Sequence, residues 1–104
     1  MSFKIKKVSS AIWPVAAPIP QDGGTIEDHN FYVRFNRLPQ KKFDELSAKG
    51  DQALLTAAIA GVGEQEDSVT KDTKATTEML GEANYRAGLY GAYLDFIVGN
   101  KAKN

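Results

Sequence analysis

The sequence predicts an α+β protein, in which an antiparallel β-hairpin or small sheet over about residues 3–37 packs against three to four C-terminal α-helices. Two patterns predict this class. Apolar residues alternate with a period of two in the first third of the chain, and they recur at helical spacing in the rest. A length of 104 residues is also typical of one domain. We therefore expect a single domain, residues 1–104, made of a hairpin part (3–37), a helical part (38–98) and a polar, frayed tail (99–104).

The hairpin part begins with imperfect alternation over residues 3–8, which we interpret as strand, and continues as an extended segment over 11–19. An Asp-Gly turn at 21–24 is among the strongest short hairpin signals. It leads into a return strand over 25–38. The predicted inner face carries Trp13, Val15, Phe31, Val33 and Phe35. Such one-sided alternation means that another part of the chain must cover this face.

Three prolines lie at even-numbered positions of the first long strand, which places them on the same side of it: Pro14, Pro18 and Pro20. Proline has no N–H to donate to a neighbouring strand. The segment is therefore predicted to be an edge strand, or to be paired on one side only at these positions.

The first helix is expected to start at Leu38-Pro39, because the missing N–H of proline is harmless at a helix start. Phe43 and Leu46 point inward at a spacing of three, and Gly50 ends the helix as a left-handed cap.

A second helix is expected to be capped by Asp51, to continue through Val62 and to be closed by Gly61 and Gly63. Its predicted apolar stripe consists of Leu54, Leu55, Ala58, Ile59 and Val62.

Residues 64–73 hold four carboxylates and one apolar side chain, which predicts a solvated and mobile loop. A short helix over 73–80 should turn Met79 and Leu80 inward. The last helix, 83–98, is the strongest periodic signal in the chain.

The last helix carries a broad apolar stripe that has two interpretations. It can be buried within this chain, or part of it can pack against another subunit or partner, since tyrosine is favoured at interfaces. Gly88 and Gly91 inside the helix suggest close approach of a neighbouring element. The candidate protein-binding residues are Leu54, Leu55, Ile59, Tyr85, Leu89, Tyr90, Tyr93, Phe96 and Ile97.

The composition excludes several classes of partner and of reactive site. The chain has 13 basic and 13 acidic residues, one histidine and no cysteine. Zero net charge argues against a nucleic-acid partner, and the absence of cysteine excludes thiolate metal sites and a cysteine nucleophile. The longest apolar stretch, 54–62, is far shorter than the ~20 residues of a membrane span. We expect a soluble protein with no membrane partner, and no secretion signal is evident.

No residue is predicted to be catalytic, and no metal or cofactor is expected. His29 follows Asp28 in the return strand, and we expect it to face solvent. The acids of the 64–73 loop lack the order of a calcium loop, and the Asp22-Gly23-Gly24 turn lacks the continuation of a phosphate loop. The protein is therefore predicted not to be an enzyme.

Six short motifs follow one another along nearly the whole chain. They are Trp13-Pro14-Val15, Pro20-Gln21-Asp22-Gly23-Gly24, Phe31-x-Val33-x-Phe35-x-Arg37-Leu38-Pro39, Asp44-Glu45-Leu46, Leu54-Leu55…Ile59-Ala60-Gly61-Val62 and Tyr85-Arg86-Ala87…Ala92-Tyr93. In this order they resemble the tail assembly chaperones of long-tailed bacteriophages of the siphovirus type. The chain departs from the family after Gly63, where it lacks a Trp and an Asp-x-x-Gly pattern.

The resemblance implies a non-catalytic binding protein. Such a chaperone keeps the tape-measure protein soluble in the host bacterial cytoplasm while tail-tube subunits polymerise, and it is absent from the mature virion. The tape-measure protein and the tail-tube subunits are then the expected partners, with a possible homo-oligomer. The alternative is a structural phage component, such as a tail-tube or head–tail connector subunit.

Overall fold

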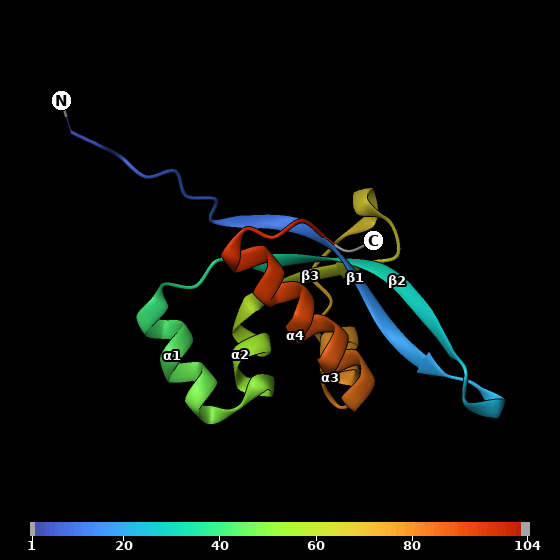
Figure 1. Ribbon diagram of the computed structural model, residues 1–104. Helices are drawn as coiled ribbons and strands as arrows, with labels where there is room; N and C mark the ends of the chain where they lie inside the picture. Colours follow the sequence, from blue (N-terminus) through green and yellow to red (C-terminus); the bar gives the residue numbers. More distant parts are fainter. Residues whose placement is uncertain (1, 103–104) are drawn as a thin grey trace.

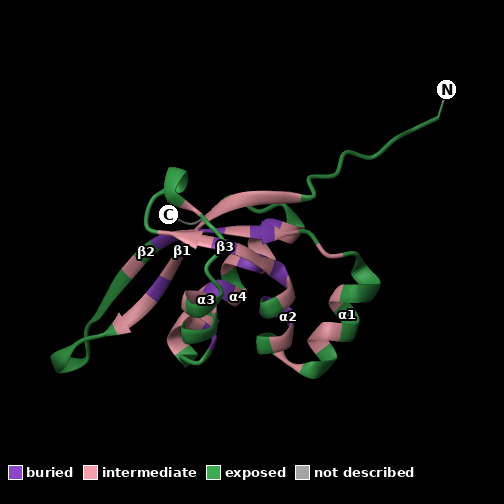
Figure 2. Cartoon of the chain, turned by 180° about the vertical axis from the view of Figure 1, so that it is seen from behind, coloured by how far each residue is buried: buried purple, intermediate pink, exposed green. Residues whose placement is uncertain are grey.

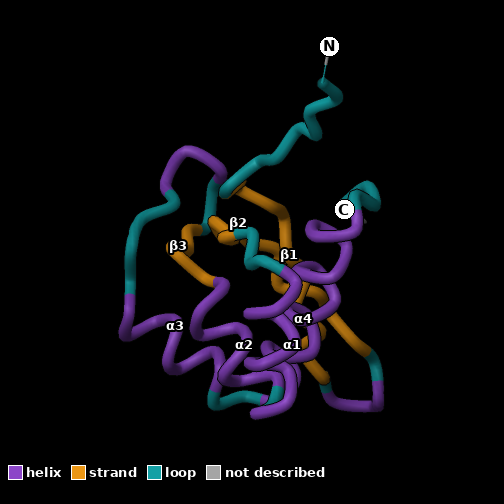
Figure 3. The backbone as a smooth tube through the Cα atoms, turned by 90° about the vertical axis from the view of Figure 1, so that its left-hand side faces the viewer, coloured by secondary structure: helices purple, strands orange, loops and turns teal. Residues whose placement is uncertain are grey.

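Four α-helices lie on one side of a three-stranded antiparallel sheet in the computed structural model, which describes residues 2–102 (Figure 1 and Figure 3). The strand order is β1-β2-β3. The elements in chain order are β1 (Ser10–Pro20), a 3₁₀ turn (Asp22–Gly24), β2 (Ile26–Asn36), α1 (Gln40–Lys49), α2 (Asp51–Ala58), β3 (Ile59–Gly63), a second 3₁₀ turn (Glu66–Ser68), α3 (Thr73–Leu80) and α4 (Ala83–Val98). The predicted α+β class is confirmed.

The β1–β2 hairpin forms as predicted, with Ser10 opposite Asn36 and Pro20 opposite Ile26. Its turn needs glycine, because Gly23 and Gly24 have φ angles of 83° and 84°. The sheet order leaves β1 at an edge.

The prolines of β1 face away from its partner strand. The Ser9 carbonyl accepts a hydrogen bond from the Arg37 N–H at 2.8 Å, so odd-numbered residues direct their backbone groups toward β2. The even-numbered residues, which include the three prolines, direct theirs outward. Proline therefore removes donors only from the open edge, where their loss discourages pairing with another chain.

Residues 2–8 do not form the predicted first strand. They have no regular secondary structure and lead away from the body of the molecule (Figure 1). Phe3, Ile5 and Val8 stay 89%, 65% and 58% exposed. These residues pair with no strand among the described residues, and an alternating pattern needs such a partner to form a strand.

The second helix is shorter than predicted, because α2 ends at Ala58 and the chain continues as strand β3. Strand β3 pairs with β2, placing Ile59 opposite Phe35 and Val62 opposite Val33. It thereby covers the edge of β2 that the hairpin leaves open. The predicted Asp51 cap is also wrong: Gly50 is the N-cap residue, and no side chain caps the helix.

Gly61 and Gly63 allow another segment to cross β3 closely, and they do not end a helix. A Cβ atom on Gly63 would lie 2.6 Å from the Ser68 carbonyl oxygen, and one on Gly61 would lie 2.9 Å from that of Thr70. Val62 and Thr70 form a two-way backbone bridge there, with N–O distances of 2.9 and 3.2 Å. The 64–73 segment is exposed over its first part, as predicted, but this bridge and the 3₁₀ turn give it defined structure.

The remaining helices form over about the predicted ranges, with differences at the two ends of α1, which begins at Gln40. Leu80 is buried at the end of α3, and Met79 packs against the core. Gly50 ends α1 with a φ of 120°, although its ψ of 164° is extended and differs from the left-handed cap expected. Gly99 ends α4 with a φ of 82°, and the Asn100 N–H donates to the Asp95 carbonyl at 2.9 Å. Residues 103–104 of the predicted frayed tail lie outside the described residues.

The core lies where α2, α3 and α4 meet the sheet (Figure 2). Four of the five predicted inner-face residues are buried, and Trp13 is partly exposed, edge-on to Phe96 with 5.6 Å between ring centres. The buried hydrophobic residues are Val15, Ala17, Phe31, Val33, Phe35, Leu54, Leu55, Ala58, Leu80, Leu89, Tyr93 and Phe96.

Helix α4 packs directly on β1. A Cβ atom on Gly88 would lie 2.5 Å from the Ala16 carbonyl oxygen, and the Asn84 amide donates to the Pro18 carbonyl at 2.9 Å. The close approach predicted at Gly88 is confirmed. At Gly91 the prediction is wrong, because nothing lies within 4 Å of a Cβ atom there.

Tyr93 anchors α4 to the end of β2. Its ring is buried edge-on to Phe35, and its hydroxyl donates to the Asn36 carbonyl at 3.0 Å. Burial raises the pKa of Tyr93 above its ordinary value of 10.0, against opposing contributions from the Leu38 backbone and the Arg37 charge.

This raised pKa predicts a loss of stability in alkali. Above pH 10 the unfolded tyrosine releases its proton while the buried one keeps it, so the free energy of unfolding falls as the pH rises toward the native pKa. We expect Tyr93→Phe to weaken this fall above about pH 10, measured by urea unfolding at a series of pH values. Tyr32→Phe, on the opposite face of β2, should keep the wild-type dependence. Identical pH profiles for wild type and Tyr93→Phe would contradict the prediction.

Candidate functional site

The structure divides the nine candidate binding residues into two groups. Five are buried in the core and cannot contact a partner in this structure: Leu54, Leu55, Leu89, Tyr93 and Phe96. The other four, Ile59, Tyr85, Tyr90 and Ile97, are partly exposed while packing against the core. The stripe is therefore mainly an intrachain contact. The stripe is broader than a hairpin alone would cover, because the sheet has a third strand and α2 and α3 also pack against α4.

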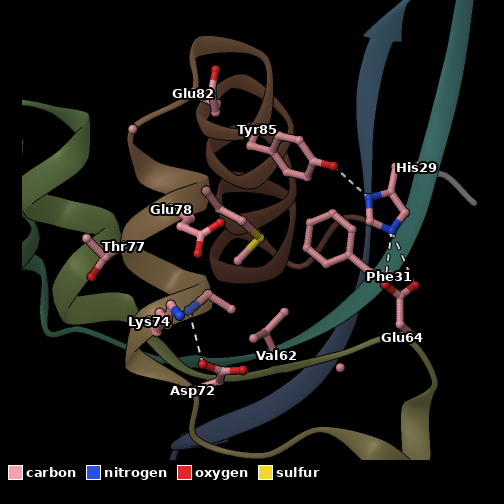
Figure 4. A pocket seen from close by; sticks show the side chains of 14 residues that line it. His29, Phe31, Val62, Glu64, Asp72, Lys74, Thr77, Glu78, Glu82 and Tyr85 are labelled. Atoms are coloured by element: carbon pink, nitrogen blue, oxygen red, sulfur yellow. Dashed lines mark hydrogen bonds and ion pairs between the residues drawn. The ribbon is translucent and has the colours of Figure 1, made fainter.

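Tyr85 lines a groove that the sequence analysis did not predict. The groove lies between α3 and the start of α4 on one side and strands β2 and β3 on the other, with a volume of about 740 Å³ (Figure 4). We call it the α3–β2 groove. Its apolar surface is formed by Phe31, Val62, Met79 and Tyr85.

Acidic side chains surround this apolar surface. Glu64, Asp72, Glu78 and Glu82 line the groove, against a single basic side chain, Lys74. The whole chain is neutral, so its charges are unevenly distributed and this groove has a negative excess. Such a site favours ligands that combine apolar and positively charged groups.

His29 does not simply face solvent, as the sequence analysis expected. Its side chain is 37% exposed and lies at the groove, with its ring centre 5.2 Å from that of Phe31. Nδ1 is 2.7 Å from the Tyr85 hydroxyl, and Nε2 is 3.2 Å from Glu64 Oε2 (Figure 4). A signal for this position was present, because residue 29 has the same parity in β2 as Phe31, Val33 and Phe35.

The hydrogen bonds of His29 suit a structural role. A carboxylate only accepts, so Nε2 donates to Glu64, and in the neutral ring Nδ1 accepts from the Tyr85 hydroxyl. Both ring nitrogens are then engaged by protein groups. His29 thus links the start of α4 to the segment that follows β3, and it holds one end of the groove together.

Neither a metal centre nor a membrane span is found in the described part of the chain. Among residues 2–102, no group of three or more histidine, cysteine or acidic side chains is placed to hold a metal ion. No helix over the same residues has both the length and the apolar character needed to cross a bilayer.

No protein-family model, curated protein or solved structure matches this chain.

Proposed function

We propose that this protein is a phage tail assembly chaperone, a non-catalytic binding protein that keeps a tape-measure protein soluble while tail-tube subunits polymerise. The proposal starts from the sequence resemblance. The observation that carries it further is the α3–β2 groove, which combines an apolar surface with acidic walls.

The groove supports binding of a chain segment. Burying apolar side chains against Phe31, Val62 and Met79 would supply the main favourable free energy, at about 25 cal/mol per Å² of apolar surface. The carboxylates would select segments that carry lysine or arginine beside their apolar residues, and they would speed the encounter. Binding of this kind keeps an aggregation-prone segment out of water and needs no covalent step. It also allows release when tail-tube subunits compete for the same client.

Co-expression with the tape-measure protein of the same phage tests the proposal. We expect the wild-type chain to keep the tape-measure protein in the soluble fraction and to co-purify with it. The double variant Glu78→Lys/Glu82→Lys should lose this effect, because it reverses the charge of the groove wall.

A matched control carries the same change of charge outside the groove. Glu45→Lys/Asp51→Lys alters exposed acids of α1 and α2 and should behave as wild type. Failure of the wild-type chain to recover any tape-measure protein would contradict the proposed function. Equal recovery by the groove variant would contradict the role of the groove.

Purified virions separate the proposal from the structural alternative. A chaperone acts before the particle is complete, so mass spectrometry of intact particles should not detect this chain. Detection at the copy number of a tail or connector subunit would favour the alternative and contradict the chaperone.

A further inference from the structure

Residues 2–8 form an arm that exposes apolar side chains. The arm is exposed along its length and points away from the body, at the opposite end from the hairpin turn (Figure 1 and Figure 2). Phe3 and Ile5 are 89% and 65% exposed, and Lys4, Lys6 and Lys7 alternate with or follow them. Large apolar side chains grouped on an exposed segment mark an interaction site.

The nearest cleft on the same molecule is a poor site for this arm. The base of the arm, through Lys6 and Val8, forms one wall of that cleft beside Trp13 and Phe96, and the other basic residues there are Arg37 and Lys101. A segment with three lysines is repelled by such surroundings.

The α3–β2 groove has the complementary character. It offers four carboxylates against one lysine around an apolar surface, and the arm offers three lysines and no acid around Phe3 and Ile5. In an extended chain, Phe3 and Ile5 lie on one side and Lys4 and Lys6 on the other. The apolar pair can then face the apolar surface while the long lysine stems reach the carboxylates of the walls.

The arm is too short to fill the groove of its own molecule. Phe3 lies seven residues before Ser10 and so at most about 25 Å from it. In β1, Ala17 pairs with His29 of β2, and Ala17 lies about 24 Å along the strand from Ser10. A folded-back arm would be fully stretched when Phe3 came level with His29, and α4, which packs on β1, would lie in its path.

We propose that the arm of one copy occupies the α3–β2 groove of a second copy. The contact joins two different surfaces, because each copy presents one arm and one groove. One copy can therefore contact two neighbours, or two copies can exchange arms reciprocally. The proposal does not depend on the chaperone function, because it concerns this chain alone. Under that function, the arm and a client segment would compete for one groove.

Sedimentation of the purified full chain tests the exchange. We expect concentration-dependent association that weakens with added salt, as charges become screened. Phe3→Ser/Ile5→Ser should weaken the association about tenfold or more, because it removes apolar side chains that become buried. Both residues lie outside the folded body, so circular dichroism should be unchanged. Val98→Ser replaces a residue that is 66% exposed on α4 and should associate as wild type.

Charge reversal identifies the two surfaces. The arm variant Lys4→Glu/Lys6→Glu should fail to bind wild-type copies whose own arms are removed. It should regain binding to Glu78→Lys/Glu82→Lys copies that also lack their arms, since the opposite signs of arm and groove are then restored. A wild-type chain that stays monomeric, or an arm variant that associates as wild type, would overturn the proposal.

The absence of native cysteine allows a direct test of proximity. Under mild oxidation, a differently tagged mixture of Ile5→Cys and Ala75→Cys chains should form the mixed disulfide, because Ala75 lines the groove. Ile5→Cys with Lys49→Cys, at the exposed end of α1, should not. In a chain that carries both Ile5→Cys and Ala75→Cys, a disulfide within one molecule, independent of concentration, would show that the arm reaches its own groove and would refute the exchange.

Discussion

Replacing Leu89 by alanine should lower the free energy of unfolding by about 2–5 kcal/mol, the usual range for removing a fully buried leucine side chain. Leu89 has no exposed surface, and it belongs to the core between α4 and the sheet. The substitution removes apolar contacts and leaves a cavity in a region held by several elements. Urea unfolding followed by circular dichroism measures this change.

The neighbouring residue provides the control. Tyr90 is partly exposed at the flank of the core, so Tyr90→Ala should cost clearly less than Leu89→Ala. This comparison separates the two interpretations of the α4 stripe. Equal and small losses at both positions would mean that Leu89 is not part of a packed core, and the stripe would again be available to a partner.

Gly88→Ala should destabilise the protein by about 1–3 kcal/mol, the cost of forcing atoms into a filled space. The new methyl group would lie 2.5 Å from the Ala16 carbonyl oxygen, so α4 or β1 must shift. Alanine favours the helix over glycine, and this gain offsets only part of the clash.

Gly91→Ala is the matched change three residues further along the same helix. Nothing lies within 4 Å of its Cβ position, so the helix preference acts alone and should stabilise the protein by about 0.5–1 kcal/mol. We therefore expect the two glycine-to-alanine substitutions to change the free energy of unfolding in opposite directions, as measured by urea unfolding. A stabilising Gly88→Ala would show that α4 does not pack on β1 as described.

The hairpin and α4 could be predicted because their signals are local. An Asp-Gly turn between alternating segments specifies a hairpin by the φ angles it needs. The spacing of Leu89, Tyr93 and Phe96 by four and three residues is that of one face of a helix. The bounds of α4 agree with the structure at both ends.

Strand β3 could not be predicted in the same way. Residues 59–62 continue the apolar run of α2, and a short run of this kind suits either a buried strand or a helix. What selects the strand is the open edge of β2, which lies more than twenty residues earlier in the chain. The glycines that suggested a helix end are needed because residues 68–70 cross β3 closely.

The candidate groove depends still more on long-range contacts. Tyr85 was predicted as a binding residue, but His29 and Glu64 come from separate segments, and their hydrogen bonds exist only because the fold brings those segments together. Parity in β2 could have placed His29 on the inner face. No local pattern could have identified Tyr85 and Glu64 as its partners.

By itself, the sequence determined the α+β class, the hairpin, the edge position of β1, the places of the helices other than the end of α2, and the lack of cysteine chemistry. These features follow from turn geometry, side-chain period and composition, which act over a few residues. Only the tertiary structure decided that most of the α4 stripe is core, that a third strand completes the sheet, and that the balanced charges are unevenly distributed, with acids around one groove and lysines on the arm. The physical reason is that the burial of a side chain and the pairing of a strand depend on contacts between segments far apart in the chain.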